Sequence, residues 1–442
     1  MAGSSGSSRR RFLKQTAALA AGSMAAPMFV SSHALAAPER PGANDRIGVG
    51  FIGCGRRASQ IMRLPAQGQI VAAADCDFQR AEKVARRTEC KSFKAYRDYR
   101  KLLHDKAVDA VVVATPDHWR ALNCIHAAQA GKDIYAEKPL TLTIKEGRAI
   151  AKAVRKYNRV FQTGSQQRSM TPNRIACEMV RNGVIGKVHT VIGANYPSPW
   201  LMNLPGQPVP EGLDWDAWCG PNPVVPFHKE IYVPRGNPGW ISVWPWSGGE
   251  MTGWGAHGLD QIQWALGADE GGPIEVWSED GPYKPKTYTA PVSRGEGNAL
   301  FKNKHRVHFR YPGDVTVKLD TGSGAGGTFI GTKGKIMIAR NKFKTDPPEL
   351  ANEPLPSDAI RLYVSTNHMQ NWFDCMNSRK RCVADVEIGH RSCTVCHLGN
   401  IARWLGRKLK WDPVKEIFPG DDEANQYLDT EKREPYKLPE TV

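Results

Sequence analysis

The chain has 442 residues, 41% hydrophobic content and 13 tryptophans, enough for two or three globular domains with proper cores. The formal net charge is +16, but basic clusters such as Arg379-Lys380-Arg381 and Arg407-Lys408 stand beside acidic stretches. That mixture is typical of a solvated surface and does not favour nucleic-acid binding. No segment is long and apolar enough to predict a membrane span.

The first 36 residues predict an export signal of the twin-arginine type. Arg9-Arg10-Arg11-Phe12-Leu13-Lys14 precedes an alanine-rich apolar stretch, and the small residues Ala34 and Ala36 suit cleavage before Ala37. This pathway carries folded proteins, so we expect a periplasmic or extracellular protein whose cofactor is loaded before export. Residues 37–45 predict a short polar linker.

The stretch from Ile47 to Ala58 predicts a dinucleotide-binding turn. A β-type apolar run ends in Gly53-x-Gly55-x-x-Ala58 and continues as a helix, so the backbone can approach a pyrophosphate at the helix N-terminus. A second apolar run ends in Asp75, where a carboxylate can accept hydrogen bonds from a ribose. Asp75 favours NAD over NADP because it repels a 2′-phosphate, although Arg56 or Arg57 would soften that preference.

The following elements predict a doubly wound parallel sheet over residues 46–165. We expect helices over 78–87, 96–103 and 119–130, and strands near 92–93 and over 108–114 and 133–136. Ala114-Thr115-Pro116-Asp117-His118-Trp119 and Glu137-Lys138-Pro139-Leu140 follow two of these strands. Both motifs therefore lie at the edge of the sheet where ligands bind.

Residues 166–442 predict a second, α/β domain. We expect a helix over 172–182, strands over 274–279, 304–311 and 315–320, a hairpin over 326–336, and closing helices over 367–378 and 389–405. Residues 196–246 are rich in Trp, Pro and Gly and show little periodicity. Indole rings stack on sugars, so this region indicates carbohydrate binding, unless its tryptophans simply form a core.

Together these motifs resemble the Gfo/Idh/MocA oxidoreductase family. The resemblance implies an N-terminal Rossmann domain, a C-terminal α/β domain with a large, mostly antiparallel sheet, and a homo-oligomer, a dimer or a tetramer. It implies action on sugars, inositols or related polyols with NAD or NADP. It also makes Lys138 the cation that contacts the substrate hydroxyl and the nicotinamide ribose, with Glu137 and Pro139 shaping its turn.

The expected site follows from these motifs. The catalytic residues are Lys138, His257 and Glu137. The cofactor-binding residues are Gly53, Gly55, Arg56, Arg57, Asp75, Thr115, Pro116, His118, Glu137, Lys138 and Gln166. The substrate residues are Arg168, Tyr196, Trp246, Trp254, His257 and Asp260, although a salt bridge between domains explains Arg168 equally well.

One position departs from the family pattern. Dehydrogenases of this family carry an aspartate four residues before the histidine, whereas Gly253 stands there in this chain. His257 can still act as the base that removes the hydroxyl proton. Glu250 or Asp260 can replace the absent acid, and the missing side chain leaves room for a bulkier substrate.

The cysteines predict neither disulfides nor a metal site. They are scattered along the chain, and Cys54 lies inside the glycine loop, so we expect mostly buried free thiols. Cys393-x-x-Cys396, with its neighbours His390 and His397, resembles half of a zinc site. No second CxxC accompanies it, so we expect no metal.

Two classes of function remain open. An exported enzyme meets no pool of free NAD, so a tightly bound cofactor must end each cycle in its starting state. Such an enzyme either oxidises one sugar and reduces another, or cleaves a glycoside by oxidation, elimination, water addition and reduction. The alternative is a non-catalytic sugar-binding protein that keeps the fold, which the loss at Gly253 favours and the intact Glu137-Lys138-Pro139 opposes.

Overall fold

A computed structural model describes residue 42 and residues 45–439. The predicted export signal, residues 1–36, and most of the predicted linker lie outside the described residues. Residues from Ile47 onward form one compact unit that contains both predicted domains. In the described part, no helix combines the length and apolar character needed to cross a membrane.

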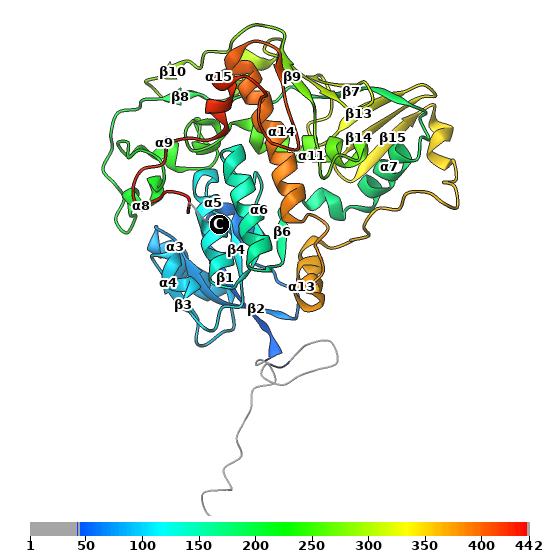
Figure 1. Ribbon diagram of the computed structural model, residues 1–442. Helices are drawn as coiled ribbons and strands as arrows, with labels where there is room; N and C mark the ends of the chain where they lie inside the picture. The colour runs from blue at the N-terminus through cyan, green and yellow to red at the C-terminus, as the bar shows by residue number, and fades with distance from the viewer. Residues whose placement is uncertain (1–41, 43–44, 440–442) are drawn as a thin grey trace, which may run out of the picture. The chain divides into compact units, whose positions relative to one another are not determined.

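The N-terminal domain is built on a six-stranded parallel sheet with the order β3-β2-β1-β4-β5-β6 (Figure 1). This order reverses direction between β1 and β4, which in doubly wound sheets marks the ligand crevice. The strands are β1 (Ile47–Ile52), β2 (Gly68–Ala74), β3 (Lys94–Tyr96), β4 (Ala110–Val113), β5 (Asp133–Ala136) and β6 (Phe161–Thr163).

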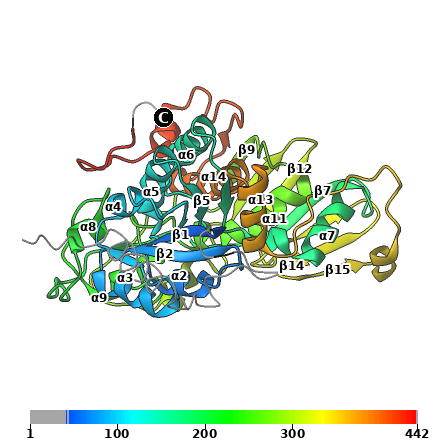
Figure 2. The same cartoon turned by 90° about the horizontal axis from the view of Figure 1, so that it is seen from below.

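Helices cover both faces of this sheet. Side chains alternate along each strand, so Phe51 packs into one core cluster with Ala58 and Val84, while Ile52 packs into another with Ile125 and Ile150. Figure 2 shows α2 and α3 on one face and α5 and α6 on the other. These helices and the short one between them are α2 (Arg56–Ile61), α3 (Phe78–Val84), α4 (Tyr99–Leu103), α5 (Asp117–Gln129) and α6 (Ile144–Lys156).

The C-terminal domain is built on an eight-stranded sheet with the order β15-β14-β13-β7-β12-β11-β9-β16, antiparallel except where β7 pairs with β12. Helices α7 (Thr171–Arg181) and α11 (Gly255–Leu266) pack against it through one large core cluster. The strands are β7 (Val188–Ala194), β9 (Glu275–Ser278), β11 (Val307–Tyr311), β12 (Val315–Asp320), β13 (Gly327–Gly331), β14 (Lys335–Ala339), β15 (Lys342–Asp346) and β16 (Leu409–Lys410). The predicted fold class is confirmed in both domains.

The tryptophan-rich region, residues 196–246, crosses to the N-terminal domain and has little regular structure. Three buried tryptophans, with Phe227 and Ile231, form its own apolar cluster, and the partly buried Trp240 packs against it. In this cluster Trp215 stacks on Trp218 with ring centroids 4.5 Å apart. Its short elements are β8 (Leu201–Met202), which pairs with β10 (Thr287–Tyr288), α8 (Trp215–Cys219) and α9 (Lys229–Tyr232), and it is followed by α10 (Glu250–Gly253). Of these, α8 and α9 lie on the same side of the molecule as α3 in both views (Figures 1 and 2).

The closing helices tie the two domains together. In α13 (His368–Ser378), Trp372 and Phe373 belong to the N-terminal core, whereas in α14 (Val386–Leu405) the first half joins that core and the second half joins the C-terminal one. The remaining helices are α12 (Arg294–Asn298) and α15 (Asp422–Asn425). The predicted strand 315–320 and helix 367–378 lie where expected. Strands β7 and β15 were not anticipated; in β15 the exposed side chains of Lys342, Lys344 and Asp346 obscure the apolar pattern.

Candidate active site

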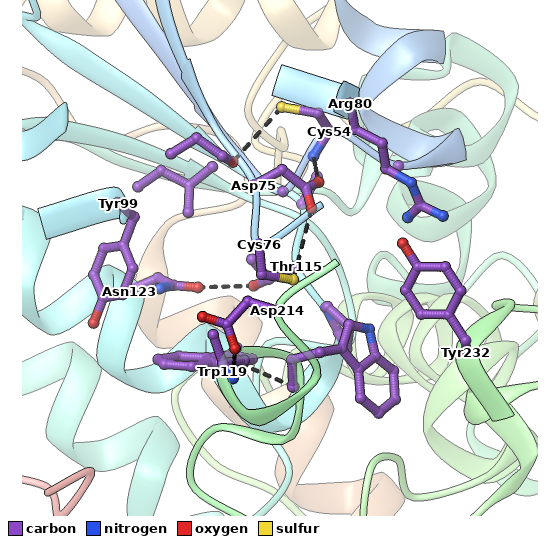
Figure 3. Close-up of a pocket in the computed structure, with 18 of the residues that line it drawn as sticks. Cys54, Asp75, Cys76, Arg80, Tyr99, Thr115, Trp119, Asn123, Asp214 and Tyr232 are labelled. Atoms are coloured by element: carbon purple, nitrogen blue, oxygen red, sulfur yellow. Dashed lines mark hydrogen bonds between the residues drawn. The ribbon is translucent and has the colours of Figure 1, made fainter. Parts of the chain in front are cut away.

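A cavity of about 770 Å³ lies at the carboxyl edge of the parallel sheet, within the range usual for ligand pockets. The glycine loop forms one wall of it, and the segment from Thr115 to Trp119 contributes to a second wall. The tryptophan-rich region forms a third wall. We call it the larger cleft (Figure 3).

The glycine loop leaves its backbone open toward the larger cleft. Gly53 adopts a φ of +80°, and a Cβ there would lie 2.8 Å from the Thr115 nitrogen, so only glycine fits. A Cβ at Gly55 would meet nothing closer than Arg80 at 3.9 Å, which leaves room for a ligand to approach. Ala58 is fully buried under the strand. All three positions behave as a dinucleotide turn requires, although α2 is short.

Asp75 stands at the end of β2 inside the larger cleft. Its Oδ2 accepts from the Cys54 backbone N–H at 2.7 Å and its Oδ1 from the Asp77 N–H at 2.9 Å. Burial raises the pKa of Asp75, and these two hydrogen bonds oppose that shift. Oδ1 also accepts from the Cys76 thiol at 3.7 Å, whereas Oδ2 keeps a further lone pair for a ribose hydroxyl.

The opposite wall comes from β4 and the start of α5. Thr115 Oγ1 donates to Asn123 Oδ1 at 2.9 Å, and Trp119 Nε1 donates to the Ala217 carbonyl at 2.9 Å. Pro116, Trp119 and Asn123 all line the larger cleft, and Figure 3 shows Tyr99 and Asn123 facing it across from Tyr232.

The tryptophan-rich region is fastened over the larger cleft at several points. The Tyr232 hydroxyl donates to Asp77 Oδ2 at 3.0 Å, and the Asp214 N–H donates to the Cys76 carbonyl at 3.0 Å. At the C-terminal end, Tyr436 packs edge-on against Trp119 with ring centroids 5.2 Å apart. The larger cleft is therefore covered by segments far from the glycine loop in sequence.

A second cavity of about 360 Å³, which we call the smaller cleft, adjoins the larger one. The two share Arg56, Arg57, Thr115, Arg235 and Trp240 as lining residues. The smaller cleft is lined in addition by Glu137, Lys138, Gln166, Gly253, Trp254, His257 and Arg340.

Lys138 is half-buried and its Nζ donates to the Gly253 carbonyl at 2.9 Å. Burial lowers the pKa of Lys138 to about 8, while the charge of Glu137 opposes the shift. Glu137 is itself fixed by Arg57 at 2.9 Å and by Gln166 Nε2 at 3.0 Å. The predicted catalytic pair at the end of β5 thus faces the smaller cleft.

His257, in the first turn of α11, also lines the smaller cleft and is 7% exposed. Burial, followed by the charges of Lys138 and Arg340, lowers the pKa of His257 well below its usual value. Its Nδ1 has no hydrogen-bond partner among the described residues. The imidazole is therefore neutral at pH 7, with one nitrogen free to accept a proton from a ligand.

Glu250 occupies the space that Gly253 leaves. A Cβ at Gly253 would lie 2.9 Å from Glu250 Oε2. The Glu250 carboxylate is held by Arg235 at 3.3 Å and by Arg294. Of the two acids considered as replacements, Glu250 is the one that lies beside this position.

Asp260 lies elsewhere. It is 1% exposed, pairs with Arg168 at 2.8 Å and accepts from Ser392 Oγ at 2.8 Å. Arg168 is equally buried and also binds Asp269 at 2.8 Å. Neither side chain lines either cleft, which corrects their expected place at the substrate. Arg168 does form salt bridges, but with Asp260 and Asp269 of its own C-terminal domain and not between the two domains.

Three further expected contact residues are buried behind the clefts. His118 Nε2 is 2.9 Å from the Trp218 carbonyl, and the Tyr196 hydroxyl donates to the Gly324 carbonyl at 3.1 Å. Trp246 is 2% exposed within the apolar cluster of the tryptophan-rich region. None of the three side chains lines either cleft, which corrects their expected contacts with cofactor or substrate.

Among the described residues, no three His, Cys, Asp or Glu side chains, those of the CxxC motif included, are grouped so that they could hold a metal ion. Cys393 and Cys396 are buried and free in α14.

Four residues that line the clefts were not anticipated from the sequence: Arg235, Tyr232, Asn123 and Arg340. Arg235, Tyr232 and Arg340 lie outside any local motif, and only long-range contacts bring them there.

Comparison with known proteins identifies the family. Residues 47–165 match the oxidoreductase family NAD-binding Rossmann fold, and residues 173–438 match the oxidoreductase family C-terminal alpha/beta domain. The chain belongs to the Gfo/Idh/MocA oxidoreductase family. Its Rossmann domain is of the NAD-binding type, and the predicted enzyme family is confirmed.

Two curated relatives are similar over part of this chain. The scyllo-inositol 2-dehydrogenase (NAD(+)) of Bacillus subtilis is 30% identical over 141 residues, 32% of this chain and 40% of that protein. A glycosyl hydrolase family 109 protein of Shewanella sp. is 28% identical over 203 residues, 41% of this chain and 44% of that protein. The chain thus matches less than half the length of each relative.

A solved structure supports the fold over a longer stretch. The aldose-aldose oxidoreductase from Caulobacter crescentus, complexed with glycerol, superposes with a TM-score of 0.57 at 16% identity. The match covers 83% of this chain and 99% of that one.

Proposed function

We propose that this protein is an NAD-dependent oxidoreductase that acts on sugars or sugar derivatives and keeps its cofactor through the catalytic cycle. The observation that carries the proposal is that Lys138 and His257 both line the smaller cleft, which adjoins the larger one. The open glycine loop and Asp75 fit a dinucleotide in the larger cleft. Bound there, NAD would supply the acceptor and later the donor of a hydride.

Lys138 and His257 divide the handling of the sugar hydroxyl. The Lys138 ammonium has three donors and uses one on the Gly253 carbonyl, so it can also donate to the hydroxyl oxygen and stabilise developing negative charge. The neutral His257 accepts the hydroxyl proton. Arg57 and Gln166 hold the Glu137 carboxylate in place beside Lys138 at the wall of the smaller cleft.

The cover over the larger cleft supports a retained cofactor. Hydrogen bonds from Tyr232 and Asp214 fasten the tryptophan-rich region to the N-terminal domain. These contacts would slow the release of a dinucleotide that lies under the cover. Retention of the cofactor suits a protein that is exported in the folded state. The N-terminal sequence favours such export, to the periplasm or the cell exterior.

A redox-neutral glycoside cleavage is the second candidate. It is supported by the similarity to a glycosyl hydrolase family 109 protein and by the cover, because a retained cofactor requires a cycle with no net redox change. The presence of Lys138 and His257 in one cleft argues against a non-catalytic sugar-binding protein.

We further propose a homo-oligomer formed through the half-exposed outer face of the eight-stranded sheet.

The test uses the purified full-length protein. Denaturation should release NAD, identified by its absorbance and by enzymatic assay, and the native protein mixed with sugars and glycosides should show reduced nicotinamide at 340 nm. Lys138→Ala should retain the nucleotide and lose the 340 nm signal, whereas Lys156→Ala, on the surface at the end of α6, should keep both. A preparation with no bound nucleotide, or an active Lys138→Ala, would contradict the proposal.

A further inference from the structure

The smaller cleft carries more positive than negative charge. Three of its arginines have acidic partners: Arg57 pairs with Glu137, Arg120 with Asp117, and Arg235 with Glu250. Three further cations of its lining, Arg56, Lys138 and Arg340, have no carboxylate within salt-bridge distance among the described residues.

Arg340 is fixed in place by neutral groups. It sits in the turn between β14 and β15, its Nε donates to Gln167 Oε1 at 3.2 Å, and its guanidinium lies over the Trp254 ring at 5.6 Å. Gln167 is buried and bonded in turn to the Ala325 carbonyl at 2.8 Å. These contacts use one of the five guanidinium N–H donors and leave both terminal nitrogens available.

Trp254 connects Arg340 to the catalytic histidine. The Trp254 ring is 41% exposed and meets the His257 ring edge-on with centroids 5.8 Å apart. Arg340 is therefore placed one aromatic ring away from the group that we assign to proton transfer, at the solvent side of the smaller cleft.

We infer that the substrate is an anionic sugar, bearing a carboxylate or a phosphate, and that Arg340 binds its anionic group. A guanidinium is suited to planar, bidentate recognition of such groups, while the exposed Trp254 face can stack on the sugar ring. This inference rests on the proposed function and names the substrate class of the same site.

The cofactor phosphates do not account for Arg340. Arg56, Arg57 and Arg235 line both clefts and can face a pyrophosphate, but Arg340 lines only the smaller one. The charges of Lys138 and Arg340 also both act on His257 and lower its pKa. An anion beside Arg340 would relieve this effect and make His257 a stronger base.

Binding is tested with matched pairs of sugars, glucuronate with glucose, galacturonate with galactose and mannuronate with mannose, together with the hexose 6-phosphates. Tryptophan fluorescence of the nucleotide-loaded protein reports binding without turnover. In at least one pair the acid should bind roughly 10- to 100-fold more tightly than the neutral sugar, the effect of a charge-assisted hydrogen bond. The phosphate series identifies which anion is preferred.

Arg340→Gln should abolish this preference, and Arg340→Lys should keep part of it. The matched control is Lys342→Gln, which removes one positive charge from the same hairpin outside both clefts and should leave the preference unchanged. Neutral sugars binding as tightly as their acids in every pair, or an unaltered preference in Arg340→Gln, would overturn the inference. An acid that binds under Arg340 control but never reduces the nicotinamide would instead contradict the proposed function.

Discussion

The Glu250 carboxylate fills the space beside Gly253, and a Cβ on Gly253 would lie 2.9 Å from Glu250 Oε2. Glu250 cannot easily move aside, because Arg235 and Arg294 both hold it. The family aspartate and this glutamate therefore exclude each other in this chain. The acid is kept near the lysine, but it comes from the preceding turn and is neutralised by arginines.

Gly253→Asp should therefore destabilise the protein and fail to raise activity. Crowding and the repulsion between two carboxylates should lower the free energy of unfolding by about 1–3 kcal/mol. Urea denaturation of Gly253→Asp, Glu250→Gln and the double variant measures the coupling. The double variant should be more stable than the sum of the single effects; strict additivity would show that the two side chains do not compete.

The activity should fall as the pH rises through about 8. The working form of Lys138 is the cation, and burial lowers its pKa to about 8, so that form is lost on the alkaline side. His257 works as the neutral imidazole, and its pKa lies well below 6.5, so no loss is expected between pH 8 and 6.5. The rate of the change at 340 nm, measured as a function of pH, checks both expectations. A rate that rises above pH 8 would instead indicate that neutral Lys138 is the base.

Tyr232→Phe should shorten the residence time of the nucleotide. The hydroxyl bond to Asp77 at 3.0 Å fastens the cover to the N-terminal domain, and the loss of one such bond costs about 0.5–1.5 kcal/mol. Dissociation should therefore be roughly 2- to 13-fold faster, measured as nucleotide per protein after timed gel filtration. Tyr157→Phe, at the end of α6, is the control. Equal retention of the nucleotide in both variants would show that the cover is not what slows its dissociation.

Arg168→Ala should damage stability and leave sugar affinity in the surviving folded protein unchanged. It leaves Asp260 buried without its partner, and breaking a buried ion pair in this way costs about 3–5 kcal/mol. Urea denaturation gives the stability, and fluorescence titration gives the affinity. A normal stability with weakened sugar binding would restore Arg168 as a substrate residue.

The sequence predicted the parts of the site that arise from local pattern. Gly53, Asp75 and Lys138 each follow a strand of the parallel sheet, so their position at its carboxyl edge could be inferred from strand order alone. The pairing of Arg168 with Asp260, 92 residues further along the chain, could not. Tyr232 and Arg340 reach the clefts from a region of little periodicity and from a hairpin turn, and no spacing rule links either to the glycine loop.

The most direct measurement of the central claim is the nucleotide content of the purified protein combined with a sugar-dependent change at 340 nm. The account predicts close to one NAD per chain, retained through gel filtration, and partial reduction on addition of substrate that is absent in Lys138→Ala. A protein that carries no nucleotide, or whose bound NAD never responds to any sugar or glycoside that binds, would contradict it.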